Sequence, residues 1–127
     1  MALALLGDVA SALSNYDAAV THFEAALKIR KRLLGHDHTA VATVLLNSAG
    51  ALEHLGRLDE AVVACSSALE IYSKVPDHDA IANCHHKTGN ILKEQGKHDE
   101  AMQHYSIGLA ITLRTSSRKR RSSTSLR

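Results

Sequence analysis

One short pattern occurs three times in this chain of 127 residues, and it limits the available folds more than any other feature. The copies are residues 15–20 (NYDAAV), 57–62 (RLDEAV) and 97–102 (KHDEAM), whose aspartates lie 42 and 40 residues apart. A period of this length is typical of solenoids, in which each repeat buries its apolar face against its neighbours. The sequence therefore predicts a stack of three similar units.

Small residues recur in register with this pattern. The reference point is the alanine at the fifth position of each copy, which is Ala19, Ala61 or Ala101. One small residue lies twelve positions before this alanine and another lies seven positions after it, while an aromatic or small apolar residue lies four positions after it. These three sets are Gly7, Ala49 and Gly89; Ala26, Ala68 and Gly108; and Phe23, Cys65 and Tyr105. Small side chains allow two helix backbones to approach closely, which predicts that each unit is a tightly packed helical hairpin.

The composition agrees with an all-helical fold. Aromatic residues make up only 3% of the chain, and its single proline is Pro76. Apolar residues at spacings of three and four predict six helices, at about 2–14, 17–34, 38–55, 59–74, 78–95 and 99–113.

Short linkers carry stop and start signals for these helices. Gly35 and Gly56 are expected to end helices, and Asp59 and Asp77 are expected to cap the helices that follow them.

The repeats resemble the tetratricopeptide repeat, and in particular the 42-residue version found in kinesin light chains. Residues 33–43 (LLGHDHTAVAT) with 46–49 (LNSA) look like the linker and first helix of those proteins, and 56–61 (GRLDEA) resembles their inter-helix turn. The resemblance implies a right-handed α-solenoid of three hairpins, at about 1–34, 38–75 and 78–113, within a domain of residues 1–115. It further implies a scaffold or adaptor that binds a partner peptide in a concave groove.

Residues 116–127 differ from the rest of the chain, because they hold five basic and no acidic residues, whereas residues 1–115 have a net charge of −3. This polar segment lacks an apolar face, so we expect a disordered tail. Its run Arg118, Lys119, Arg120 and Arg121 is a candidate nuclear localisation signal or an electrostatic contact for RNA or acidic lipid. Ser122 and Ser123 are candidate phosphorylation sites. We favour a merely solvated tail over these roles, because short basic runs are common.

No pattern of catalytic residues occurs, so we expect a protein that is not an enzyme and needs no cofactor. Nine histidines include the pairs His36 with His38 and His85 with His86, but their spacing does not converge on one zinc ion, so no metal site is expected. Cys65 and Cys84 follow no metal-binding or redox motif and are expected to be reduced core residues. With no apolar stretch long enough for a membrane span, a cytosolic location is expected.

In such a solenoid the first helix of every hairpin lines the groove, so its polar residues are the candidate ligand contacts. The predicted groove residues are Asp8, Asn47, Glu53, Asn83, His86, Lys87, Asn90 and Lys93. Asparagine side chains can hydrogen-bond to a peptide backbone, and an extended protein segment is therefore the expected ligand. Co-chaperone repeats that resemble this one hold the C-terminal carboxylate of a chaperone. Because Asp8 would repel a carboxylate, this kind of binding is disfavoured here.

The primary hypothesis is thus a protein-interaction module. The alternative is a nuclear or nucleic-acid-associated protein whose basic tail makes the main contact. No polar capping helix follows residue 113, which leaves two alternatives: the chain is part of a longer repeat protein, or it self-associates through its last repeat.

Overall fold

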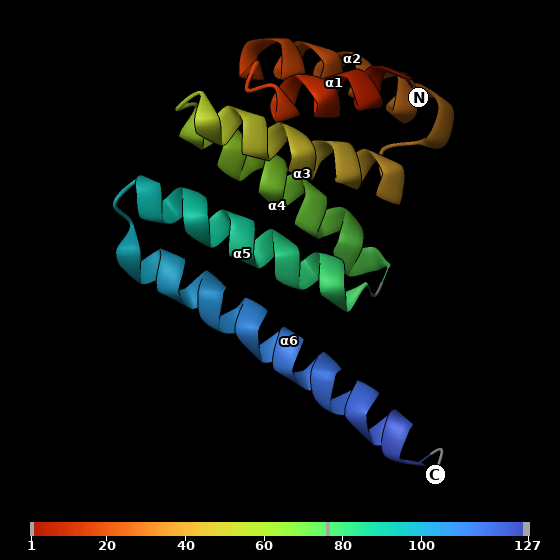
Figure 1. The fold of residues 1–127 in the computed structure, drawn as a ribbon, viewed down its shortest axis with the longest axis vertical. Helices are drawn as coiled ribbons and strands as arrows, with labels where there is room; N and C mark the ends of the chain where they lie inside the picture. The colour runs from red at the N-terminus through yellow and green to blue at the C-terminus, as the bar shows by residue number, and fades with distance from the viewer. Residues whose placement is uncertain (1, 76, 126–127) are drawn as a thin grey trace.

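The computed structural model describes the backbone of residues 2–75 and 77–125 and the side chains of residues 5–75 and 77–115. This part of the chain is all helical: it forms α1 (Ala2–Ala12), α2 (Tyr16–Leu34), α3 (Thr39–His54), α4 (Leu58–Lys74), α5 (His78–Glu94) and α6 (His98–Ser125). The helices pair as three hairpins that stack from α1 at one end to α6 at the other (Figure 1). The predicted all-α solenoid of three hairpins is confirmed.

Side-chain caps start several helices close to where the sequence predicts them. Asp77 Oδ1 accepts a hydrogen bond from Ala80 N at 3.1 Å, which confirms the predicted cap of α5, whereas Pro76 lies outside the described residues. The predicted cap at Asp59 is wrong. Helix α4 begins one residue earlier, with Arg57 at the cap position and no side-chain bond there. Asp59 therefore lies in the first turn, where its charge still favours the helix dipole.

The turns inside the hairpins need a left-handed backbone. Gly56 and Gly96 adopt φ angles of 79° and 81° in the second and third hairpins, and Gly35 adopts 90° after α2. In the first hairpin the corresponding residue is Ser14, which has φ 61°. A non-glycine residue in this region is strained by roughly 1–2 kcal/mol, so the first hairpin turn is the costliest of the three.

The last helix differs most from its predicted bounds. The sequence predicts an end near residue 113, but α6 continues to Ser125. No glycine or proline follows Gly108, so nothing in the backbone chemistry stops the helix there. The side chains of residues 116–125 lie outside the described part, as do Leu126 and Arg127. The predicted disorder of residues 116–127, and the roles predicted for their serines and arginines, stay predictions.

The first and second helices of the hairpins form two rows of different spacing. Each first helix contacts the next one along the stack, α1 with α3 and α3 with α5. Among the described residues the second helices, α2, α4 and α6, do not contact one another. The row of first helices is therefore the tighter, inner side of a curved stack, and the second helices form its outer side.

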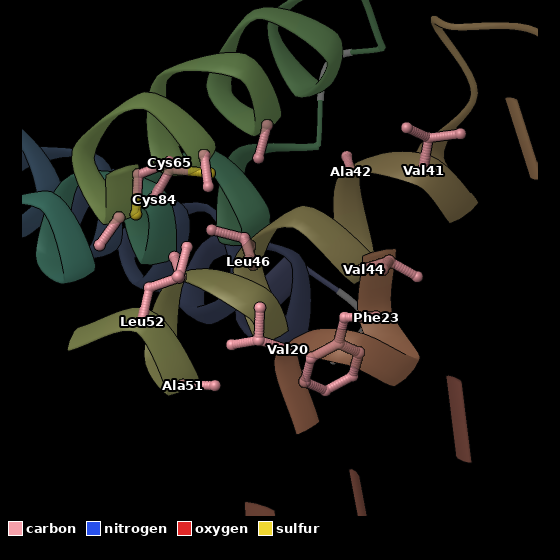
Figure 2. Close-up of a cluster of buried hydrophobic side chains, with 14 of the residues drawn as sticks. Val20, Phe23, Val41, Ala42, Val44, Leu46, Ala51, Leu52, Cys65 and Cys84 are labelled. Atoms are coloured by element: carbon pink, nitrogen blue, oxygen red, sulfur yellow. The ribbon is translucent and has the colours of Figure 1, made fainter. Parts of the chain in front are cut away.

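One apolar core runs through the three hairpins. Its most deeply buried large side chains are Phe23, Val41, Val44, Cys65, Cys84 and Ile91. Figure 2 shows Cys65 and Cys84 near one another, from neighbouring helices of two hairpins. Burial raises the pKa of the Cys84 thiol to about 12 and also raises the pKa of Cys65. Both are free and buried, as predicted from the sequence.

Candidate functional site

A hollow of about 340 Å³ lies on the inner row, where α1, α3 and α5 come together. Three of the predicted groove residues, Asp8, Asn47 and Lys87, line it, one from each first helix. Its other lining residues are Ser11, Ala12, Tyr16, Phe23, Gly50, Ala51 and His54. Residues that are about 40 positions apart in the sequence thus converge on one surface, as the repeat spacing predicts.

Polar groups at the rim of this hollow are arranged across helices. Asn47 Nδ2 donates a hydrogen bond to Asp8 Oδ1 at 3.3 Å, which links α3 to α1. Lys87 is half-buried and forms no ion pair with any side chain that the structure describes. The hollow therefore presents one carboxylate, one amide and one unpaired ammonium group to a ligand.

An aromatic pair closes one side of the hollow. The rings of Tyr16 and His54 stack with their centroids 4.3 Å apart and their planes 8° from parallel. Both residues line the hollow, so the stacked pair offers a flat apolar wall beside the polar rim. The repeat pattern does not predict this pair, because the two residues occupy different positions in different repeats.

Glu53 lies farther along the inner row and interacts with Glu94 of α5. Burial, together with a hydrogen bond and charge repulsion from Glu94, raises the pKa of Glu53 from 4.5 to about 7, although Lys87 opposes the shift. The Glu53 carboxyl group is thus partly protonated at neutral pH. Glu94 was not among the predicted groove residues, since only the solenoid geometry brings it near Glu53.

The remaining predicted groove residues do not converge on the first hollow. Asn83 and His86 line a second hollow of about 510 Å³, between α5 and α6. Asn90 Oδ1 accepts a hydrogen bond from Tyr105 Oη at 2.5 Å, and the Lys93 side chain is exposed. The predicted groove residues are therefore divided between two surfaces, because the helix turns Asn83 and His86 toward α6.

In the described part of the chain, no more than two histidines come together at one place. His85 Nδ1 and His104 Nδ1 are 3.0 Å apart, within hydrogen-bonding distance. Burial and the neighbouring His104 lower the pKa of His85. No group of three or more metal-binding side chains occurs among the described residues. None of the helices described is both long and apolar enough to cross a membrane.

Comparison with known families agrees with this architecture. The family model for the tetratricopeptide repeat matches residues 1–62 and 41–114, which together cover most of the chain. The chain belongs to the tetratricopeptide repeat family. The matched ranges extend over all three hairpins.

The relatives of this tetratricopeptide repeat protein include kinesin light chain-related proteins. Protein KINESIN LIGHT CHAIN-RELATED 3 of Arabidopsis thaliana is 30% identical over 101 residues, which are 78% of this chain and 16% of the relative. The chain thus spans about a sixth of that relative's length. The predicted similarity to kinesin light chain-like repeats is confirmed.

Solved structures show the same fold. BtubC (BKLC) from P. vanneervenii superposes with a TM-score of 0.81 at 23% identity, over 86% of this chain and 44% of that one. A putative kinesin light chain from Podosopora anserina with nearly identical TPR-like repeats superposes with a TM-score of 0.79 at 19% identity, over 90% of this chain and 55% of that one. At these identities the likeness concerns the fold alone.

Proposed function

We propose that this tetratricopeptide repeat protein is an interaction module that binds an extended segment of a partner protein along its inner row of first helices. The main support is the hollow lined by Asp8, Asn47 and Lys87, because three successive repeats contribute to a single surface. A scaffold role agrees with the family, whose repeats bury their apolar faces in the stack and leave the inner surface free for ligands.

The chemistry of the hollow favours a ligand with both polar backbone groups and an apolar side chain. Asn47 can donate to a peptide carbonyl after exchanging its hydrogen bond with Asp8, which is 3.3 Å long and exposed to solvent. The Lys87 ammonium group can form an ion pair with the ligand or donate a hydrogen bond to it. The Tyr16 and His54 rings can pack against an apolar side chain.

A binding measurement on a matched pair of variants tests this proposal. Peptides that bind the intact chain are first selected from a display library of extended sequences. Their affinity is then measured by calorimetry for the chain itself and for the double variant Asn47→Ala, Lys87→Ala. We expect a loss of about 1–3 kcal/mol, since the groups that remain on the peptide lose their partners.

The control variant removes the same chemistry from the outer row. Lys28 of α2 and Gln103 of α6 are exposed, so Lys28→Ala, Gln103→Ala should leave peptide affinity and melting unchanged. Undiminished binding by the inner variant, with loss of binding by the outer one, would contradict the proposal. So would binding that disappears when residues 116–127 are removed and weakens steeply with salt, because the basic tail would then be the contact.

The predicted absence of enzymatic activity and the predicted cytosolic location stay predictions. Both agree with an interaction module, and neither bears on the binding experiment.

A further inference from the structure

At each inter-repeat interface, the first helix of a hairpin packs against the second helix of the preceding hairpin, as α5 does on α4. Gln95, at the end of α5, donates a hydrogen bond from Nε2 to Asp59 Oδ1 of α4 at 2.7 Å. Thr88 and Ile91, seven and four residues earlier on the same side of the helix, are 6% and 1% exposed. Positions 88, 91 and 95 thus pack against the second helix of the preceding hairpin.

Helix α1 and the residue that follows it form an apolar stripe at the same repeat positions. Aligning Gly7 with Gly89 places Leu6, Val9 and Leu13 where α5 has Thr88, Ile91 and Gln95. The three side chains of this α1 stripe are 47%, 47% and 76% exposed, because no described helix precedes α1. The stripe therefore has the position and the apolar character of an inter-repeat contact but has no partner within the described chain.

Helix α6 shows the complementary surface. In the middle hairpin, α4 has Val62, Cys65, Leu69 and Tyr72 along one side, and all four are buried or half-buried. The equivalent positions of α6 are Met102, Tyr105, Leu109 and Thr112, which we call the α6 stripe.

The α6 stripe is far more open than its counterpart on α4. Met102 and Leu109 are 63% and 60% exposed. Tyr105, Leu109 and Thr112 line the hollow of about 510 Å³ together with residues of α5. In the middle hairpin α5 packs on the corresponding surface.

The two stripes cannot meet within one molecule, because α1 and α6 lie at opposite ends of the stack (Figure 1). We propose that copies of this chain associate head to tail, with the α1 stripe of one copy packed on the α6 stripe of the next. Such a contact continues the interface that already joins α3 to α2 and α5 to α4. It is heterologous, so it extends into open chains or closes into a ring instead of ending at a symmetric dimer.

This assembly is independent of the proposed peptide binding. It uses the two ends of the solenoid, whereas the hollow lined by Asp8, Asn47 and Lys87 lies on the inner row.

Sedimentation velocity of the 127-residue chain over a concentration series tests the proposal. The chain should form a ladder of species that grows with concentration. Leu13→Glu and Leu109→Glu each place a charge in one stripe, and each variant alone should weaken association by roughly 10- to 100-fold, as expected for an apolar side chain lost from an interface. Val63→Glu is the matched control: Val63 of α4 is 64% exposed but lies in neither stripe, so this variant should associate like the unchanged chain.

Mixing the two stripe variants gives the sharpest result. The Leu13→Glu chain keeps its α6 stripe and the Leu109→Glu chain keeps its α1 stripe, so an equimolar mixture should form a one-to-one dimer that does not grow. A chain that stays monomeric throughout the series overturns the proposal. Association abolished by Leu109→Glu but untouched by Leu13→Glu also overturns it, since two α6 stripes would then pair symmetrically. If a glutamate variant unfolds, Leu13→Ala and Leu109→Ala replace it, because each removes apolar contact area from its stripe without adding a charge.

Discussion

The Tyr105 ring lies directly against the backbone of Gly89: a Cβ atom built on Gly89 would be 2.8 Å from Tyr105 Cε1. Gly7 and Phe23 have the same relationship in the first hairpin, with a distance of 2.6 Å. The middle hairpin has Ala49 and Cys65 at the equivalent positions. The three hairpins thus keep the combined size of the pair, either as glycine with an aromatic ring or as alanine with a smaller side chain.

We expect Gly89→Ala to lower the free energy of unfolding by up to about 2 kcal/mol. Overpacking against a ring costs about 1–3 kcal/mol, and the better helix propensity of alanine returns only about 1 kcal/mol. Most of this cost should vanish in the background Tyr105→Cys, which recreates the pair of the middle hairpin. Urea unfolding of the two single variants and the double variant measures the coupling, and additive effects would contradict the steric explanation.

Gly50→Ala should have the opposite effect. Gly50 lies inside α3, and a Cβ atom built there has no neighbour within 4 Å. The substitution should therefore raise the free energy of unfolding by about 0.5–1 kcal/mol through helix propensity alone. Thermal melting of Gly50→Ala, Gly89→Ala and the unchanged chain measures the difference. A destabilising effect would mean that a neighbour not seen in this arrangement packs against Gly50.

The sequence predicts most of the fold because its signals are local and repeated. The start of α5 follows from the Asp77 cap, and the hairpin turn at Gly56 follows from the residue type that a left-handed backbone needs. The end of α6 was not predictable in this way, since no stop signal lies between Gly108 and Ser125.

The candidate site was predicted only in part. Asp8, Asn47 and Lys87 converge because they obey the repeat spacing. The Glu53 and Glu94 interaction joins different positions of two repeats, and the curvature that brings them together leaves no mark in the sequence.

Glu53→Gln should change how stability depends on pH. The pKa of Glu53 is about 7 in the folded chain and 4.5 when the group is unperturbed. Between these two pH values the folded state therefore binds the proton more tightly than the unfolded state does. Its contribution to stability is complete below pH 4.5 and is lost as the pH rises through 7. The variant should remove this loss and raise stability at neutral pH by on the order of 1 kcal/mol or less, because much of the side chain is solvated. Melting temperatures from pH 4 to 8 measure it, and an unchanged profile would refute the assignment.

The pair His85 and His104 should produce the opposite pH dependence. Their Nδ1 atoms are 3.0 Å apart, so one ring donates and the other accepts, and protonation of both rings breaks the hydrogen bond. The pKa of His85 is lowered below 6.5 by burial and by His104. As the pH falls below 6.5, the unfolded state therefore binds more protons than the folded state. The packing of α5 on α6 loses stability in this range.

The middle hairpin supplies a matched replacement for this pair. Leu45 and Ala64 occupy the positions equivalent to His85 and His104, and both lie in the apolar core or against it. The double variant His85→Leu, His104→Ala should be at least as stable at pH 7 and should lose the acid sensitivity between pH 6.5 and 5. Measuring it in the Glu53→Gln background removes the opposing contribution of that carboxyl group. Acid sensitivity that survives in this triple variant would show that another group titrates, and that the histidine pair only fills space between the two helices.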